Sequence, residues 1–165
     1  MTPILRTARL ALRPYVPEDE EGFVRLFSDA DVTRWMGIPR DPRALFRRGF
    51  TEPHLITWDV WAIVEGDGYV GHAEIKPSPD PQVDGHELVY ALLPEAWGRG
   101  LGTEVAEAVT AHGLGALGLA EVHATVDPDN AASLALLRRL GYADVRDLVD
   151  PSDGEVSRLL TRSRA

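Results

Sequence analysis

The sequence feature that most constrains the fold of this chain is a glycine-rich segment between a strand pattern and a helix pattern. Residues 87–93 form a mostly apolar run suited to a buried central strand, and residues 103–112 place small apolar side chains on one helical face. The segment between them contains Gly98-Arg99-Gly100-Leu101-Gly102-Thr103. A glycine turn that opens a helix leaves backbone N–H groups unpaired, and the helix dipole adds partial positive charge there. We therefore expect a loop that binds a phosphate-bearing ligand.

Two common phosphate loops do not fit this segment. The dinucleotide fingerprint needs GxGxxG early in a βαβ unit with an acidic residue about 20 positions later. Here the spacing is GxGxG in the middle of the chain, and Glu121 lies at the start of the next predicted strand. The Walker loop requires a lysine after its last glycine, and the only lysine among 17 basic residues is Lys76.

The remaining patterns predict seven strands and four helices. We expect strands within 7–16, 58–64, 69–75, 87–93, 121–126, 142–149 and 155–160, and helices within 18–28, 42–50, 103–112 and 131–140. This order indicates one α/β (α+β) domain over residues 1–165, with a mixed, mostly antiparallel twisted sheet of about seven strands and four flanking helices.

Composition excludes several classes of function. The chain has no cysteine, and its five histidines show no metal-ligand spacing, so no metal is expected. A net charge of -9 without a basic cluster argues against nucleic acid. No apolar run approaches a membrane span and no secretory signal opens the chain, so we expect a cytoplasmic protein that does not bind membranes.

Three segments carry a family resemblance. Residues 87–103, ELVYALLPEAWGRGLGT, resemble the central motif of the GNAT N-acetyltransferase superfamily. Residues 127–142, DPDNAASLALLRRLGY, resemble its next motif, and residues 5–23, LRTARLALRPYVPEDEEGF, resemble its usual first strand and helix. The order and wording of these motifs most resemble those of the branch that includes ribosomal-protein N-terminal acetyltransferases. One departure is Trp97, which stands where many members carry Gln or Arg.

The resemblance implies transfer of acetyl from acetyl-CoA to a primary amine, either a peptide or protein N-terminus or a small molecule. A non-catalytic acyl-CoA-binding module is the alternative. In the family, a backbone N–H near a bulge of the central strand donates a hydrogen bond to the oxyanion, and the corresponding segment here is 91–93. The residues expected to contact acetyl-CoA are Ala91, Leu92, Leu93, Gly98, Arg99, Gly100, Leu101, Gly102, Thr103, Asn130 and Ser133.

Glu87 is the first candidate for the base, because a carboxylate shielded by apolar neighbours can accept a proton near neutral pH. A purely structural or substrate-binding Glu87 remains the alternative, with Glu74, His72 and His123 as reserves.

Ser133 is the candidate acid for the CoA thiolate, with Tyr142 as the alternative donor. Physically, Asn130 can instead be only a helix cap. Arg138 and Arg139 face either solvent or the cofactor's outer phosphate. Exposed strands of the last hairpin leave monomer and homodimer both open.

Overall fold

The computed structural model describes residues 1–37 and 39–165. One eight-stranded sheet runs through it in the order β1-β2-β3-β4-β5-β6-β8-β7. The strands are β1 (Leu5–Arg6), β2 (Ala11–Arg13), β3 (Asp59–Glu65), β4 (Gly68–Pro77), β5 (His86–Leu92), β6 (Glu121–Val126), β7 (Ala143–Val149) and β8 (Val156–Ser163). The pair β5–β6 is parallel and the other six pairs are antiparallel.

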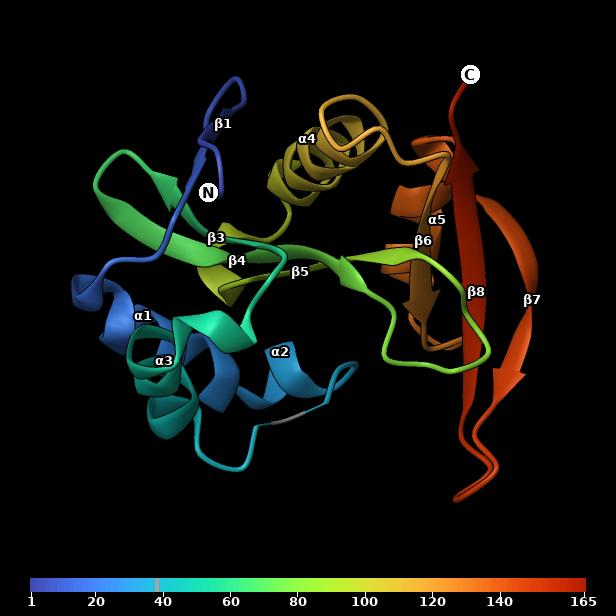
Figure 1. Ribbon diagram of the computed structural model, residues 1–165, viewed down its shortest axis with the longest axis horizontal. Coiled ribbons are helices and arrows are strands. Elements are labelled where there is room, and N and C mark those ends of the chain that lie inside the picture. Colours follow the sequence, from blue (N-terminus) through green and yellow to red (C-terminus); the bar gives the residue numbers. More distant parts are fainter. Residues whose placement is uncertain (38) are drawn as a thin grey trace.

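Helices cover both faces of this sheet, as Figure 1 shows. The helices are α1 (Glu20–Ser28), α2 (Ala30–Thr33), α3 (Pro42–Thr51), α4 (Leu101–Leu114) and α5 (Ala131–Arg139). Helices α1–α3 lie against one face of β3–β5, whereas α4 lies on the opposite face. Helix α3 begins where its sequence predicts. The Asp41 carboxylate caps it by accepting from the Ala44 amide, and Pro42 occupies the first helical position.

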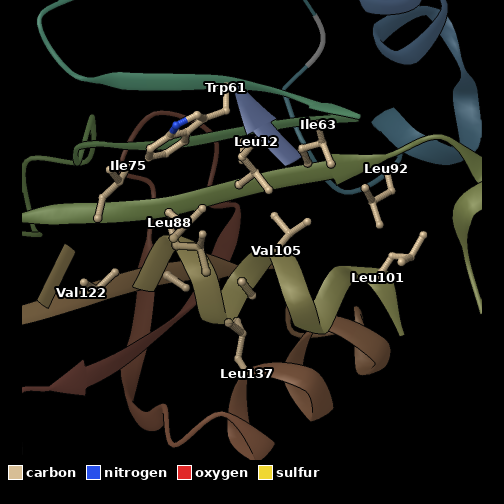
Figure 2. Packing of buried hydrophobic residues seen from close by; sticks show 14 of the residues in the cluster. Leu12, Trp61, Ile63, Ile75, Leu88, Leu92, Leu101, Val105, Val122 and Leu137 are labelled. Atoms are coloured by element: carbon tan, nitrogen blue, oxygen red, sulfur yellow. The ribbon is translucent and has the colours of Figure 1, made fainter. Parts of the chain in front are cut away.

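The main core fills the space between the sheet and helices α4 and α5 (Figure 2). Trp61 and Ile63 of β3 point toward Val105 of α4, and Leu137 of α5 closes the cluster. A second cluster, which includes Phe23, lies on the other face beneath α1 and α3. Alternation along the strands therefore separates two apolar layers.

Strands β5 and β6 pair at one register position, Glu87 with His123, in the described part of the chain. In contrast, β4 and β5 pair along seven positions, from Gly71–Leu92 to Pro77–His86. The ladder between β5 and β6 therefore extends no further toward the C-terminal end of β5, which leads into the glycine loop.

The predicted α/β class and mostly antiparallel sheet are confirmed. The expected seven strands become eight, because β1 lies before the first predicted strand, within which β2 forms, and a turn joins the two. The four expected helices become five, since Asp29 caps the four-residue α2 through two backbone amides. None of the described helices is long and apolar enough to cross a membrane.

Candidate active site

The predicted glycine loop lies between β5 and α4, and two of its glycines have left-handed backbone conformations. Gly98 has φ 72° and Gly100, the residue that caps α4, has φ 79°. Side chains with a Cβ strongly disfavour this region, so the turn requires glycine at both positions. Gly102, by contrast, belongs to the first turn of α4. Together with Leu101 and Thr103, these three glycines line a long cleft.

Trp97 ties this loop to the central strand. Its indole Nε1 donates to the carbonyl oxygen of Leu92 over 2.8 Å, while 46% of the residue stays exposed at the cleft. This hydrogen bond ties the start of the loop to the end of β5.

Arg99 turns away from the cleft that its neighbours line. Its guanidinium forms two hydrogen bonds, of 3.0 and 2.6 Å, with the carboxylate of Glu65, the last residue of β3. This pairing lowers the pKa of Glu65 and raises that of Arg99. The predicted contact of Arg99 with acetyl-CoA therefore stays a prediction, since its side chain pairs with Glu65 and does not line the cleft.

Ala91 and Leu92, the last residues of β5, line the cleft, whereas the buried Leu93 that follows them does not. Leu93 donates its amide to Val70 of β4 over 2.8 Å, so that amide is already paired. Amides alternate in direction along an antiparallel strand, which directs that of Leu92 away from β4 and toward β6. The register between β4 and β5 is unbroken here, so no bulge interrupts β5 against β4. A register shift lies between β3 and β4, where Ile63 and Val64 pair with Gly71 and Tyr69 and leave Val70 of β4 as the extra residue.

At the N-terminal end of α5, the cap residue Asn130 and Ser133 of the first turn also line the cleft. Asn130 caps the helix by accepting from the Ser133 amide over 3.3 Å, as its position predicts. The buried hydroxyl of Tyr90 has no hydrogen-bond partner within the described residues. Burial raises the pKa of Tyr90, and the neighbouring Ser133 side chain opposes the shift. A buried hydroxyl without a partner at a cleft wall is the kind of group that a ligand or water satisfies.

Three further residues that the sequence singled out, Tyr142, Arg138 and Arg139, lie in different environments. Tyr142 is 3% exposed and its hydroxyl lies 2.7 Å from Thr110 Oγ1, inside the main core rather than at the cleft wall. Burial raises the pKa of Tyr142 to about 12. Arg138 pairs with Asp144 through two hydrogen bonds of 2.9 and 2.7 Å, whereas Arg139 lines the cleft.

Glu87 lies where β5 and β6 pair. It is 4% exposed, lines the cleft, and its Oε1 accepts from Thr125 Oγ1 of β6 over 2.6 Å. Of the reserves, His123 lies opposite it in the parallel register, but both ring nitrogens already contact Thr161 Oγ1 and the carbonyl of Asp84, at 2.7 and 3.1 Å.

The other two reserves, His72 and Glu74, belong to a hydrogen-bonded chain that the sequence patterns do not reveal. His72 Nε2 lies 2.7 Å from Glu74 Oε1, and Trp58 Nε1 donates to Glu74 Oε2 over 2.8 Å. On the other side, His72 Nδ1 lies 2.8 Å from the hydroxyl of Tyr15, which lies 2.7 Å from that of Tyr69. All but Tyr69 line the cleft. We call these five residues the His72 chain.

Burial and partners set the charges in the His72 chain. Burial raises the pKa of Tyr15 and of Tyr69, so both hydroxyls stay protonated. For Glu74, burial favours the neutral form, but the hydrogen bond and charge of His72, Lys76 and the Trp58 donor outweigh it and lower the pKa to about 2. The chain therefore contains an ionised carboxylate at a largely buried position.

The described residues include no cluster of three or more His, Asp and Glu side chains placed to hold a metal ion.

A family model described as an acetyltransferase (GNAT) domain matches residues 9–143 of this chain. The Bacillus subtilis N-acetyltransferase YoaA is 31% identical over 86% of the chain and 84% of its own length. The protein thus belongs to the GNAT acetyltransferase family and is an acyltransferase.

Solved structures share the whole fold. A Mycobacterium smegmatis RimJ in complex with CoA-disulfide superposes with a TM-score of 0.78 at 18% identity, over 98% of this chain and 86% of that one. The Vibrio cholerae spermidine N-acetyltransferase, solved with CoA and spermine, gives 0.79 at 13% identity, over 95% and 96%.

Proposed function

We propose that the protein transfers the acetyl group of acetyl-CoA to a primary amine by direct attack of the nitrogen on the thioester. One observation carries this proposal. A single cleft is lined by the glycine loop, by Ser133 and by Glu87, so groups suited to binding, protonation and deprotonation share one space. Relatives solved with CoA support the choice of donor.

The chain's own groups fit such a donor. The first turn of α4 offers unpaired amides and the positive end of a 14-residue helix to a diphosphate. The exposed guanidinium of Arg139 reaches the same cleft and suits a further phosphate. The unpartnered hydroxyl of Tyr90 and the side chain of Asn130 supply hydrogen bonds for the amide-bearing arm.

Each chemical step then has a residue. The Leu92 amide, directed toward β6, donates to the oxygen of the thioester carbonyl as negative charge develops there. Glu87 removes a proton from the attacking nitrogen, and Ser133 donates one to the departing sulfur. Tyr142 is a weaker candidate for this last role, because its hydroxyl lies against Thr110 in the core.

For the acceptor we favour a protein or peptide N-terminus or a small cationic amine. Spermidine is the substrate named for one relative with this fold. A net charge of -9 steers cations toward the molecule. The acceptor enters from the α1–α3 face, where Trp58, Glu74 and Phe46 line the cleft.

Release of free thiol from acetyl-CoA in the presence of an amine panel tests this function. We expect acetyl-CoA to raise the melting temperature and at least one amine to release CoA. A thermal shift without thiol release from any amine, and without any effect of Glu87→Gln, would favour the non-catalytic acyl-CoA-binding module. No shift at all would reject both functions.

A further inference from the structure

All four phenylalanines of this chain line the cleft, although they come from two different helices that pack side by side (Figure 1). Phe23 and Phe27 belong to α1, whereas Phe46 and Phe50 belong to α3. The ring centroid of Phe23 lies 4.7 Å from that of Phe27 and 5.3 Å from that of Phe46. Phe50 continues the row, 5.1 Å beyond Phe46. The four rings therefore form one continuous aromatic surface, which we call the phenylalanine wall.

The inner end of the phenylalanine wall reaches the end of β5, where the proposed function places the thioester. The ring of Phe27 lies 5.3 Å from that of His72, which is opposite Ala91 of β5 in the strand register. Ala91 belongs to the same apolar cluster as Phe27. The next residue, Leu92, carries the amide proposed to meet the thioester oxygen. An acceptor whose nitrogen attacks there has its own carbon atoms beside the wall.

The outer end of the wall leaves large apolar side chains exposed. Phe50 is 42% exposed, compared with 7% for Phe46. Leu45 of the same helix and Leu55 and Ile56 beyond it are also between 41% and 48% exposed, and all of them line the cleft. Soluble proteins rarely gather large apolar side chains on one exposed surface unless that surface binds something. The wall thus offers apolar area to a ligand from its buried end to this rim.

Charges at the rim are balanced, in contrast to the net charge of -9 of the whole chain. Arg48 of α3 pairs with Glu52 over 2.9 Å, and both residues line the cleft. On α2, Asp31 is accompanied by Arg34 at the C-terminal end of the helix. The overall negative charge acts on an amine that approaches from a distance, whereas these paired signs act on the part of the acceptor that lies along the rim.

Charges deeper in the same half of the cleft are also offset. The carboxylate of Glu74 lies beside the positive charges of His72 and Lys76, and it already accepts hydrogen bonds from His72 and Trp58. Glu87, the proposed base, therefore faces the single ammonium group that is to react. A second positive charge on the acceptor gains no net attraction from the described residues along the wall.

We propose that the acceptor is a primary amine linked to a large apolar group, with one positive charge, and that the phenylalanine wall holds this group. The inference rests on the proposed function and narrows its substrate class. A peptide whose N-terminal residue has an aromatic or branched aliphatic side chain shares this chemistry with a free arylalkylamine. A polyamine lacks the apolar group and carries additional positive charge.

Pairs of acceptors that differ only in the apolar group test this preference, with thiol release from acetyl-CoA as the measurement. We expect at least about 10-fold higher kcat/KM for 3-phenylpropylamine than for propylamine, the discrimination typical of an apolar pocket. A tripeptide amide that begins with phenylalanine should exceed one that begins with serine by a similar factor. The pair with the higher kcat/KM identifies the source of the amine. Spermidine should be at least about 10-fold poorer than the better apolar acceptor.

Phe50→Ser tests the wall itself, because this exposed position can lose its ring without opening the core. We expect the kcat/KM ratio within the preferred pair to fall at least about 3-fold. Leu117→Ser is the matched control, since Leu117 is 43% exposed but does not line the cleft, and it should leave the ratio unchanged. Because each ratio is taken within one variant, any loss of folded protein cancels.

Equal kcat/KM within both pairs, or a higher value for spermidine, would overturn the inference and leave the proposed function intact. An unchanged ratio in Phe50→Ser would overturn it too. If that variant also lost a dimer present in the wild type, as sedimentation would show, the exposed rim would be a contact between copies of this chain. Failure of every amine to release CoA would instead reject the proposed function.

Discussion

Thr125 Oγ1 of β6 donates to Glu87 Oε1 of β5 over 2.6 Å, beside the register pair at which these strands meet. This contact holds the proposed base at a buried position in the cleft wall. It also makes the carboxylate part of the sheet's own structure, so activity and stability must be measured together.

Glu87→Gln should separate the two roles. Glutamine keeps an oxygen for Thr125, so we expect little change in melting temperature but a fall of at least about 10²-fold in kcat/KM. Thr125→Val should do the reverse, lowering the free energy of unfolding by about 1–3 kcal/mol because a buried carboxylate loses a donor. Chemical unfolding and thiol release measure both. Full activity in Glu87→Gln would assign Glu87 to structure alone.

Gly100→Ala should damage the cofactor loop through its backbone. The residue has φ 79°, and an added Cβ would lie 3.3 Å from Arg9 Nη2. We expect a loss of about 1–2 kcal/mol in stability and most of the acetyl-CoA-induced thermal shift. Arg99→Ala is the comparison, since this side chain pairs with Glu65. Similar losses of cofactor binding in the two variants would contradict the backbone-centred loop.

The adjacent arginines of α5 offer a charge-matched pair. Arg139→Ala should weaken acetyl-CoA binding about tenfold, as expected for loss of a hydrogen bond to a charged group. Arg138→Ala should leave affinity unchanged, because this residue pairs with Asp144 outside the cleft. Calorimetric titration at two salt concentrations measures this difference, and the reverse order would reject the proposed position of the phosphate.

Ser133→Ala and Tyr142→Phe distinguish the two candidate acids. We expect Ser133→Ala to lower kcat about 10²-fold with little effect on unfolding. Tyr142→Phe removes a buried hydrogen bond to Thr110, so it should lower stability by about 1 kcal/mol and leave kcat unchanged. A large kcat loss confined to Tyr142→Phe would transfer the role to that residue.

Acid should destabilise the protein partly through Glu74. The pKa of this carboxyl is lowered from 4.5 to about 2 in the folded state. Its contribution is therefore fully present above the unfolded value and is lost as pH falls toward 2. Urea unfolding at pH 6 and pH 3 should show a smaller loss in Glu74→Gln than in wild type. An identical loss in both would mean that Glu74 is not held in its charged form.

Sequence reasoning predicts the parts of this cleft that are encoded locally. The glycine loop and the Asn130 cap each lie within a few residues along the chain, and the structure places both at the cleft. The strands of the hairpins β3–β4 and β7–β8 also lie close to their predicted ranges.

Sequence reasoning does not predict contacts between segments that are distant along the chain. Tyr15 meets His72 across 57 residues, and Arg99 meets Glu65 across 34. No spacing rule reports such pairs, because strand order and register create them. For the same reason, the sequence alone singled out neither Tyr15 nor Trp58, and it could not divide the roles of Arg138 and Arg139.

The short ladder between β5 and β6 also limits how stable this protein can become. Within the described residues β5 pairs with β6 at Glu87 and His123, so amides further along β5 that point toward β6, such as that of Leu92, keep hydrogen-bonding capacity that a ligand can use. A substitution that extended the pairing between β5 and β6 would raise the free energy of unfolding and remove the space for the substrate. Selection for catalysis therefore keeps this sheet incomplete, and the most thermostable variants should be sought at β7, far from the opening.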